Sequence, residues 1–168
     1  MSLHRAWIGL GSNLDDPLAR VARALDELDR LPLTRRIAAS SRYASRPQGP
    51  QDQPDFINAV ACLETRLSPL ALLDQLQALE QRHRRVRARR WGPRTLDLDL
   101  LLFDDDVLAL PRLRVPHPEM ARRAFVLVPL LSLVPDLRLP DGRRLVDLVA
   151  ALPDADLREV LPPEGGDR

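Results

Sequence analysis

The segment that most constrains the fold is Leu96–Phe103, LDLDLLLF, in which acidic and aliphatic residues alternate. Side chains of a β-strand point alternately to its two faces, so this pattern predicts a strand with Asp97 and Asp99 on one face and leucines on the other. We expect Leu101 and Phe103 to continue the carboxylate face as an apolar surface.

Two carboxylates about 7 Å apart beside an apolar surface repel each other and lose hydration. A multivalent cation would relieve both problems, and oxygen ligands suit Mg²⁺. The alternative is a half-exposed strand whose solvent face carries two acids. Just upstream, Arg94 could bind an anion, and Trp91 offers a large flat ring on a Gly-Pro turn.

Composition predicts a folded globular chain of one domain. The 168 residues are 45% hydrophobic and 29% charged. A net charge of +1 implies no bulk attraction to nucleic acid or to a membrane. The basic residues are unevenly placed, however, because seven arginines fall within 82–94. This run is either a solvated helix end or, as we favour from its density, a polyanion-binding segment.

A single cysteine, Cys62, excludes a disulfide within the chain and indicates a reducing compartment. We expect a buried, inert thiol there. The chain shows no signal-peptide pattern and no apolar run of about 18 residues, so a cytoplasmic protein is predicted.

Periodicity predicts an α+β, ferredoxin-like domain, with a mainly antiparallel sheet and helices packed on one face. Gly11 is interpreted as a turn residue that ends the first strand. We expect a domain over 1–152 and an extended or frayed tail over 153–168. The expected strands are 3–10, 36–45, 56–65 and 96–103, and the expected helices are 17–31, 69–86, 119–131 and 144–152.

Several polar residues outside this strand are candidates for ligand contact. The loop 46–55, rich in proline, is either a binding loop or plain surface. Asn58 lies in an apolar strand, so its carboxamide either caps a neighbouring loop or contacts a ligand. Gln77 and Glu80 share a helix face. His117 stands between two prolines, which suggests a fixed position.

Four blocks in this order resemble the 6-hydroxymethyl-7,8-dihydropterin pyrophosphokinase family. They read GSNL at 11–14, GPQDQPDFINA at 49–59, RWGPRTLDLDLL at 90–101 and VPHPEM at 115–120, with Arg123 and Phe125 following. The resemblance covers about residues 5–150. It implies transfer of the β,γ-pyrophosphoryl group of ATP to the hydroxymethyl group of the pterin, with release of AMP, in folate biosynthesis. Two Mg²⁺ ions are implied as cofactors, and long mobile active-site loops are implied around the bound substrates.

The resemblance also implies roles for individual residues. Asp97 and Asp99 match the Mg²⁺ ligands, and with Arg85, Arg87 and Arg94 they form the implied catalytic set. The implied pterin-binding residues are Ser45, Arg46, Gln48, Phe56, Asn58, Trp91 and Phe125. The implied ATP-binding residues are Leu73, Gln77, Glu80, Arg85, Arg87, Arg90, Trp91, Arg94, Leu100, Arg112, Leu113, His117 and Arg123. Which of Arg87, Arg89 and Arg90 contacts a given phosphate stays open.

Two other functions are weighed against this one. A ferredoxin-like sheet can bind RNA through stacked aromatic residues, but this chain has only six aromatic residues and no aromatic run of that kind. An inactive nucleotide-binding homologue is the other, and the matching acids, rings and arginines argue against it. The expected partners are therefore ATP and the pterin, with the next enzyme of the folate pathway as a further candidate, and neither nucleic acid nor membrane.

Overall fold

The computed structural model describes residues 2–14, 16–46, 54–85, 96–153 and 156–162, and the structural statements below concern these residues. Its elements run along the chain as follows: β1 (His4–Ser12), α1 (Pro17–Leu28), β2 (Thr34–Ala39), β3 (Arg42–Ser45), β4 (Phe56–Thr65), α2 (Pro69–Arg85), β5 (Asp97–Phe103), β6 (Leu108–Ala109), β7 (Arg114–Val115), the 3₁₀ turn η1 (Met120–Arg122), α3 (Ala124–Leu133), α4 (Leu145–Ala151) and β8 (Leu157–Leu161).

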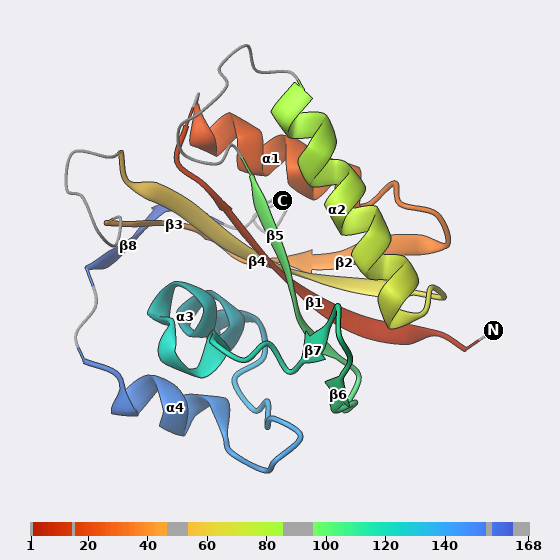
Figure 1. The fold of residues 1–168 in the computed structure, drawn as a ribbon. Coiled ribbons are helices and arrows are strands. Elements are labelled where there is room, and N and C mark those ends of the chain that lie inside the picture. Colours follow the sequence, from red (N-terminus) through yellow and green to blue (C-terminus); the bar gives the residue numbers. More distant parts are fainter. Residues whose placement is uncertain (1, 15, 47–53, 86–95, 154–155, 163–168) are drawn as a thin grey trace.

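A six-stranded sheet forms the centre of the molecule, in the order β5-β1-β4-β3-β8, with β2 beside β4 as well. All its pairings are antiparallel, as predicted. In Figure 1, α1 and α2 lie on one side of this sheet, and α3 and α4 lie on the other. The α+β, ferredoxin-like fold is thus confirmed, but helices cover both faces and not one.

The sheet separates two apolar cores. The core under α1 and α2 receives Ile57, Ala59, Ala61 and Leu63 from β4. The core under α3 and α4 receives the intervening residues Val60 and Cys62. Alternate residues of β4 thus enter opposite cores, and burial on both faces explains why most residues of this strand are apolar.

The strand β5 departs from simple alternation near its end. Ile8 of β1 pairs with Leu100, whereas Trp7 pairs with Leu102, so Leu101 is an extra residue in a β-bulge. Beyond the bulge the faces exchange, and Phe103 packs under α1 and α2. The prediction that Phe103 continues the carboxylate face is therefore wrong, because an inserted residue shifts the two-residue period by one.

Two predicted elements are broken in the structure. The strand expected over 36–45 divides into β2 and β3, because Ser40 leaves the strand and its hydroxyl accepts a hydrogen bond of 2.9 Å from the Val60 amide. The helix expected over 119–131 is interrupted at Arg123, which has an extended backbone (φ −115°, ψ 105°) between η1 and α3.

Side-chain caps define the starts of α1 and α2. Asp16 caps α1, and its carboxylate accepts a hydrogen bond of 3.4 Å from the Ala19 amide. Ser68 does the same for α2 through a bond of 3.2 Å from the Ala71 amide. A proline follows each cap, where its fixed φ suits the first turn and its missing N–H costs nothing.

A buried polar bridge joins α1 to α2. His83 is 2% exposed, and its Nδ1 lies 3.2 Å from Nη1 of Arg20, which can only donate. Its Nε2 lies 2.6 Å from a carboxylate oxygen of Glu27. Acceptance at Nδ1 and donation at Nε2 satisfy both ring nitrogens of His83. This bridge holds the last turns of α2 against α1.

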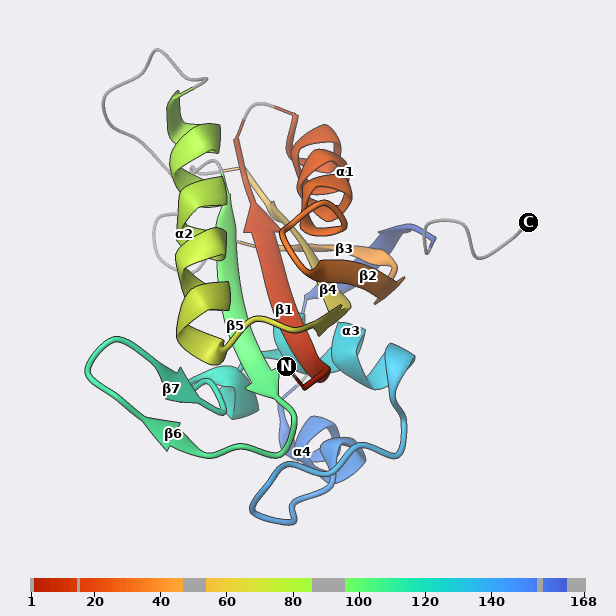
Figure 2. The ribbon, with the colours of Figure 1, turned by 90° about the vertical axis from the view of Figure 1, so that its right-hand side faces the viewer.

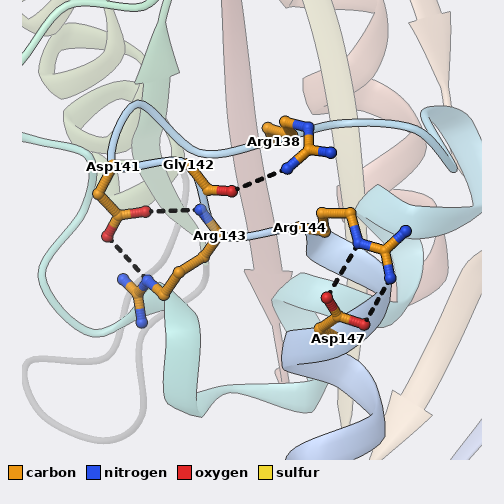
Figure 3. A network of polar contacts seen from close by, with 6 residues as sticks. All are labelled: Arg138, Asp141, Gly142, Arg143, Arg144 and Asp147. Carbon is orange, nitrogen blue, oxygen red and sulfur yellow. Dashed lines mark hydrogen bonds and ion pairs between the residues drawn. The ribbon is translucent and has the colours of Figure 1, made fainter.

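Hydrogen bonds of arginine and aspartate side chains stabilise the connection between α3 and α4 (Figure 3). Asp141 accepts hydrogen bonds from the backbone N–H and from Nε of Arg143, at 3.0 and 2.8 Å. Arg144 binds Asp147 through two nitrogens, at 3.0 and 3.1 Å. Gly142 has φ +94°, which favours glycine. Residues 140–142 therefore form a turn.

Candidate active site

A cavity of about 290 Å³ opens on the α3 side of the sheet. Its walls come from β1, β3, β4, β5 and the start of α3, segments that are far apart in the sequence. The residues that line it are Gly9, Leu10, Gly11, Ser45, Arg46, Phe56, Asn58, Ala59, Asp97, Asp99, Arg123, Phe125 and Val126. Of the predicted site residues that the structure describes, eight are brought together here: Ser45, Arg46, Phe56, Asn58, Asp97, Asp99, Arg123 and Phe125.

Two glycines of β1 form part of the cavity lining. Gly11 pairs with Asn58 on one side and with Asp97 on the other, and Gly9 pairs with Asp99. A Cβ atom on Gly11 would lie 3.4 Å from Oδ1 of Asn58. Any side chain there would fill the space between the carboxamide and the carboxylates. The interpretation of Gly11 as a turn residue is wrong, and the two-residue spacing of the glycines within a strand was the signal that the sequence offered.

The carboxylates of Asp97 and Asp99 are half-buried and line the cavity from β5. Nη1 of Arg123 lies 3.9 Å from Oδ2 of Asp99, because the break before α3 places this arginine at the cavity. Within the described part of the chain, no third acid, histidine or cysteine joins them in a metal-binding group. Two partly exposed oxygen donors fit a hard cation that takes its other ligands from water or from a bound phosphate.

Aromatic side chains lie at two places on the cavity wall. Phe56 begins β4, Phe125 lies in the first turn of α3, and both are half-buried. The guanidinium of Arg123 lies 5.6 Å from the centroid of the Phe125 ring, within cation–π range. Apolar ring faces beside polar groups suit a flat heterocycle.

Asn58 is 3% exposed and provides the polar edge of the cavity. Its Nδ2 donates a hydrogen bond of 2.8 Å to Oγ of Ser45 on the neighbouring strand. A carboxamide has a second N–H and a carbonyl oxygen as well. The bond to Ser45 fixes the amide plane, so these remaining groups keep one orientation toward the cavity.

The predicted ATP-binding residues of α2 lie along the outer edge of β5. Glu80 accepts a hydrogen bond of 2.8 Å from the backbone N–H of Leu98, which lies between the two aspartates in sequence. Burial raises the pKa of Glu80, and the charges of Asp97 and Asp99 raise it further. Glu80 therefore supports the edge strand that carries the carboxylates.

Gln77 is tied to the hairpin formed by β6 and β7, which Figure 2 shows near the first turns of α2. Nη2 of Arg112 donates to Oε1 of Gln77 at 3.2 Å and to Oδ1 of Asp74 at 2.5 Å. His117 follows the hairpin, and its backbone N–H donates to the Leu101 carbonyl at 2.9 Å. Contacts with α2 and β5 thus hold these predicted residues around the strand that carries the aspartates.

The predicted apolar contacts belong to the core under α1 and α2. Leu100 and Leu113 are buried there, and Leu73 packs against it. Gln48, Arg87, Arg90, Trp91 and Arg94 lie outside the described residues, as does the side chain of Arg85 at the end of α2. The roles given to individual residues stay predictions.

The structure defines an α+β protein of ferredoxin-like type with a cavity on one sheet face. Its structure resembles that of a Plasmodium falciparum HPPK-DHPS crystallised with pteroate, with a TM-score of 0.72 and 14% sequence identity. The match covers 89% of this chain and 42% of that one, so this chain spans less than half of the longer protein. At this identity the likeness concerns the fold.

The family follows from the sequence. The family model of 7,8-dihydro-6-hydroxymethylpterin-pyrophosphokinase matches residues 7–135, and the chain belongs to this family. Membership makes it an enzyme that transfers diphosphate. Within the described residues, no helix is both long and apolar enough to cross a bilayer.

Two relatives carry the name 2-amino-4-hydroxy-6-hydroxymethyldihydropteridine pyrophosphokinase. The one from Pseudomonas aeruginosa is 58% identical over 90% of this chain and 93% of its own length. The one from Haemophilus influenzae is 47% identical over 94% of this chain and 98% of its own length. The resemblance seen in the sequence motifs is therefore confirmed at the level of the family.

Proposed function

We propose that the protein transfers the β,γ-diphosphate of ATP to the hydroxymethyl group of 6-hydroxymethyl-7,8-dihydropterin and depends on Mg²⁺. The products are AMP and the pterin diphosphate, an intermediate of folate biosynthesis. One observation carries the proposal. Asp97 and Asp99 on β5 and Asn58 on β4 line one cavity from either side of β1, where Gly11 pairs with Asn58 and Asp97.

The pterin fits the part of the cavity bounded by β3, β4 and α3. The rings of Phe56 and Phe125 offer flat apolar faces for stacking. Asn58, oriented by Ser45, offers a donor and an acceptor to the ring edge. Arg46 lines the same wall, and Gln48 and Trp91 complete the proposed set. Discrimination for a pterin comes from the buried carboxamide, which would lose its hydrogen bonds with a ring that lacks a matching edge.

Asp97 and Asp99 would hold the metal ions, two in number by resemblance to the family. Mg²⁺ supplies charge neutralisation at the phosphates and makes a bound alcohol more acidic. The cation Arg123, 3.9 Å from Asp99, keeps positive charge at the cavity end where the phosphates would lie. Arg85, Arg87 and Arg94 are the further cations proposed there, which would stabilise the charge that develops on the phosphoryl oxygens.

The ATP would lie along β5, beside α2 and the hairpin. Proposed polar contacts come from Gln77, Glu80, Arg112, His117 and Arg123, with Arg90 and Trp91 from the segment before β5. Leu73, Leu100 and Leu113 would supply apolar and backbone contacts to adenine. This arrangement brings the phosphate chain past the aspartates to the mouth of the pterin cavity.

The reaction is an in-line displacement at the β-phosphorus of ATP. The hydroxymethyl oxygen of the pterin forms the new O–P bond, and the bond from the β-phosphorus to the oxygen shared with the α-phosphate breaks. AMP leaves with that oxygen and its electron pair, and the hydroxyl proton is released. Because such transfers depend chiefly on positioning and electrostatics, the aspartates and arginines do most of the catalytic work.

The cellular setting is part of the proposal. A chain with a buried free cysteine and no candidate spanning helix within its described residues fits the cytoplasm. The Plasmodium falciparum protein combines HPPK and DHPS in one chain, which supports the next enzyme of the pathway as a partner. We also propose a single pyrophosphokinase domain over 1–152 and a C-terminal tail over 153–168, whose strand β8 pairs with β3 of that domain.

AMP formation tests the proposed function. Purified protein with ATP should form AMP only when both 6-hydroxymethyl-7,8-dihydropterin and Mg²⁺ are present. Omission of either, or replacement of the pterin by a pterin without the hydroxymethyl group, should reduce the rate to background. Pterin-independent AMP release at the full rate would contradict the proposal.

A further inference from the structure

The strand β8 has no part in the function proposed above. It follows α4 and returns to the far edge of the sheet, antiparallel to β3 (Figure 1). Its first residue, Leu157, pairs with Ser45, which in turn pairs with Phe56 of β4. Leu157 of β8 therefore lies in line, across the sheet, with Ser45 and Phe56, two residues that line the cavity. The sequence predicted this segment as an extended or frayed tail, and 157–161 are extended but paired in the sheet.

Ion pairs connect this strand to both residues next to the Ser45–Phe56 pair. Arg46 follows Ser45, and its Nε contacts a carboxylate oxygen of Asp156. Asp55 precedes Phe56, and its Oδ2 lies 3.0 Å from Nη2 of Arg158. The C-terminal segment thus supplies the acid of one pair, Asp156, and the basic residue of the other, Arg158.

A second cavity connects the same segment to the proposed pterin site. It has a volume of about 280 Å³ and lies between β3, β8 and the start of α3. Ser45, Arg46, Arg123 and Phe125 line both cavities. The C-terminal residues on its wall are Leu152, Pro153, Asp156 and Leu157.

The short strand β3 needs this support. Only Tyr43, Ala44 and Ser45 pair with β4, so β8 supplies the other ladder of hydrogen bonds. At the start of β3, the hydroxyl of Ser41 donates to Oε2 of Glu159 at 2.5 Å. A side chain whose backbone is held on both sides loses less freedom when a ligand binds.

We propose that β8 and Asp156 position the pterin site: the pairs Asp156–Arg46 and Arg158–Asp55 hold the ends of β3 and β4 so that Ser45 and Phe56 stand ready for the ring. Asp156 and Arg158 are positioning residues, since they act through their partners. The inference rests on the proposed function. Its competitor is a strand that contributes to folding stability alone.

Charge reversal at Arg158 tests the inference. The probe is 6-hydroxymethylpterin, titrated calorimetrically with Mg²⁺ and a nonhydrolysable ATP analogue present. Because the pair is exposed, we expect Arg158→Asp to weaken pterin binding by about threefold to tenfold. Affinity for the ATP analogue should stay within about twofold, since the pair contacts only the pterin side.

The swapped pair is the specific control. Asp55→Arg combined with Arg158→Asp restores opposite charges, and pterin affinity should return to within about twofold of the parent. Arg35→Asp removes an exposed cross-strand pair with Glu64 at the other end of β4 and should leave pterin binding unchanged. If Arg35→Asp and Arg158→Asp have equal melting temperatures but only Arg158→Asp weakens pterin binding, the loss of affinity does not come from a loss of folding stability.

Three results would overturn the inference. They are an unchanged pterin affinity in Arg158→Asp, an equal loss for both ligands, and a swapped pair that fails to recover. If Arg158→Asp does not fold, Asp156→Asn offers the same test with a smaller change of shape, and an unchanged pterin affinity there would equally refute the inference. Failure of the parent protein to bind the pterin would instead refute the proposed function.

Discussion

Asn58 donates a hydrogen bond of 2.8 Å from Nδ2 to Oγ of Ser45, and both residues line the cavity that also holds the aspartates. This contact links two neighbouring strands, and it determines which groups of the carboxamide a ligand meets. The carboxamide that the sequence marked as unusual within an apolar strand is thus held in place by a residue of the same site.

Replacing Asn58 tests recognition of the pterin edge. Asn58→Ala should weaken pterin binding by about 1–3 kcal/mol, because ring groups lose buried partners. ATP binding should change far less, since the carboxamide lies on the β4 side of the cavity. Calorimetry with each ligand measures both effects. Ser45→Ala is the matched control, and it should lower pterin affinity less, because the amide of Asn58 stays but is no longer held in one orientation. Equal losses of affinity for ATP and for the pterin in Asn58→Ala would contradict the assignment.

Replacing the aspartates tests the proposed metal ligands. Asp97→Asn and Asp99→Asn keep side-chain size but remove the charge, and each should lower kcat by at least about 100-fold. Circular dichroism should show the parent fold, because both side chains are half-buried at the strand edge. Mg²⁺ should no longer strengthen nucleotide binding in these variants. Near-normal AMP formation by either variant would remove the metal role.

A larger side chain in place of Gly11 tests whether the pterin binds in this cavity. A Cβ on Gly11 would lie 3.4 Å from Oδ1 of Asn58, and the two further methyl groups of Gly11→Val would extend into the cavity. We expect loss of measurable pterin binding with nucleotide binding retained. Binding of 6-hydroxymethylpterin by Gly11→Val at parent affinity would show that the ring lies elsewhere.

The raised pKa of Glu80 predicts how the free energy of unfolding depends on pH. Burial first, then the charges of Asp97 and Asp99, raise its pKa above 4.5. The folded state therefore binds a proton more tightly than the unfolded state, and stability falls as pH rises from about 4.5 through the raised pKa. Glu80→Gln keeps an acceptor for the Leu98 amide and should flatten this part of the curve of unfolding free energy against pH.

A second variant separates the charge of Glu80 from its hydrogen bond. Glu80→Ala leaves the Leu98 amide without its side-chain acceptor and should be about 1 kcal/mol less stable than Glu80→Gln at every pH. Urea unfolding at several pH values between 4 and 8 measures both variants. Identical pH slopes for the parent and Glu80→Gln would show that Glu80 does not titrate in this range.

Cys62 should be unreactive in the folded protein. It is 1% exposed, and burial raises the pKa of its thiol to about 12. The reactive thiolate is then scarce at pH 8. A thiol reagent such as Ellman's reagent should give no signal within minutes with native protein and one equivalent after denaturation in guanidinium chloride. Rapid labelling of the native protein would contradict this placement.

Much of the fold follows from local sequence pattern. β4 has the predicted bounds, and the starts of α1 and α2 follow from the Asp16-Pro17 and Ser68-Pro69 caps. The errors lie where tertiary contacts override local pattern. The bulge at Leu101 depends on register with β1, and the helical pattern around Arg123 gives no sign of its extended backbone. The pairing of β8 joins residues more than a hundred positions apart, which no local pattern can show.

The candidate site was predictable in its chemistry but not in its construction. Alternation placed Asp97 and Asp99 on one face, and polarity marked Asn58. The glycine lining required knowledge that β1 lies between β4 and β5. The support that Glu80 gives to the Leu98 amide required the packing of α2 against the edge strand.

The central claim is that both terminal phosphates of ATP move together onto the pterin. Mass spectrometry of a reaction with 6-hydroxymethyl-7,8-dihydropterin, ATP and Mg²⁺ measures this directly. The account predicts AMP and a pterin that has gained two phosphoryl groups, formed in equal amounts. ADP together with a pterin carrying one phosphoryl group would contradict it.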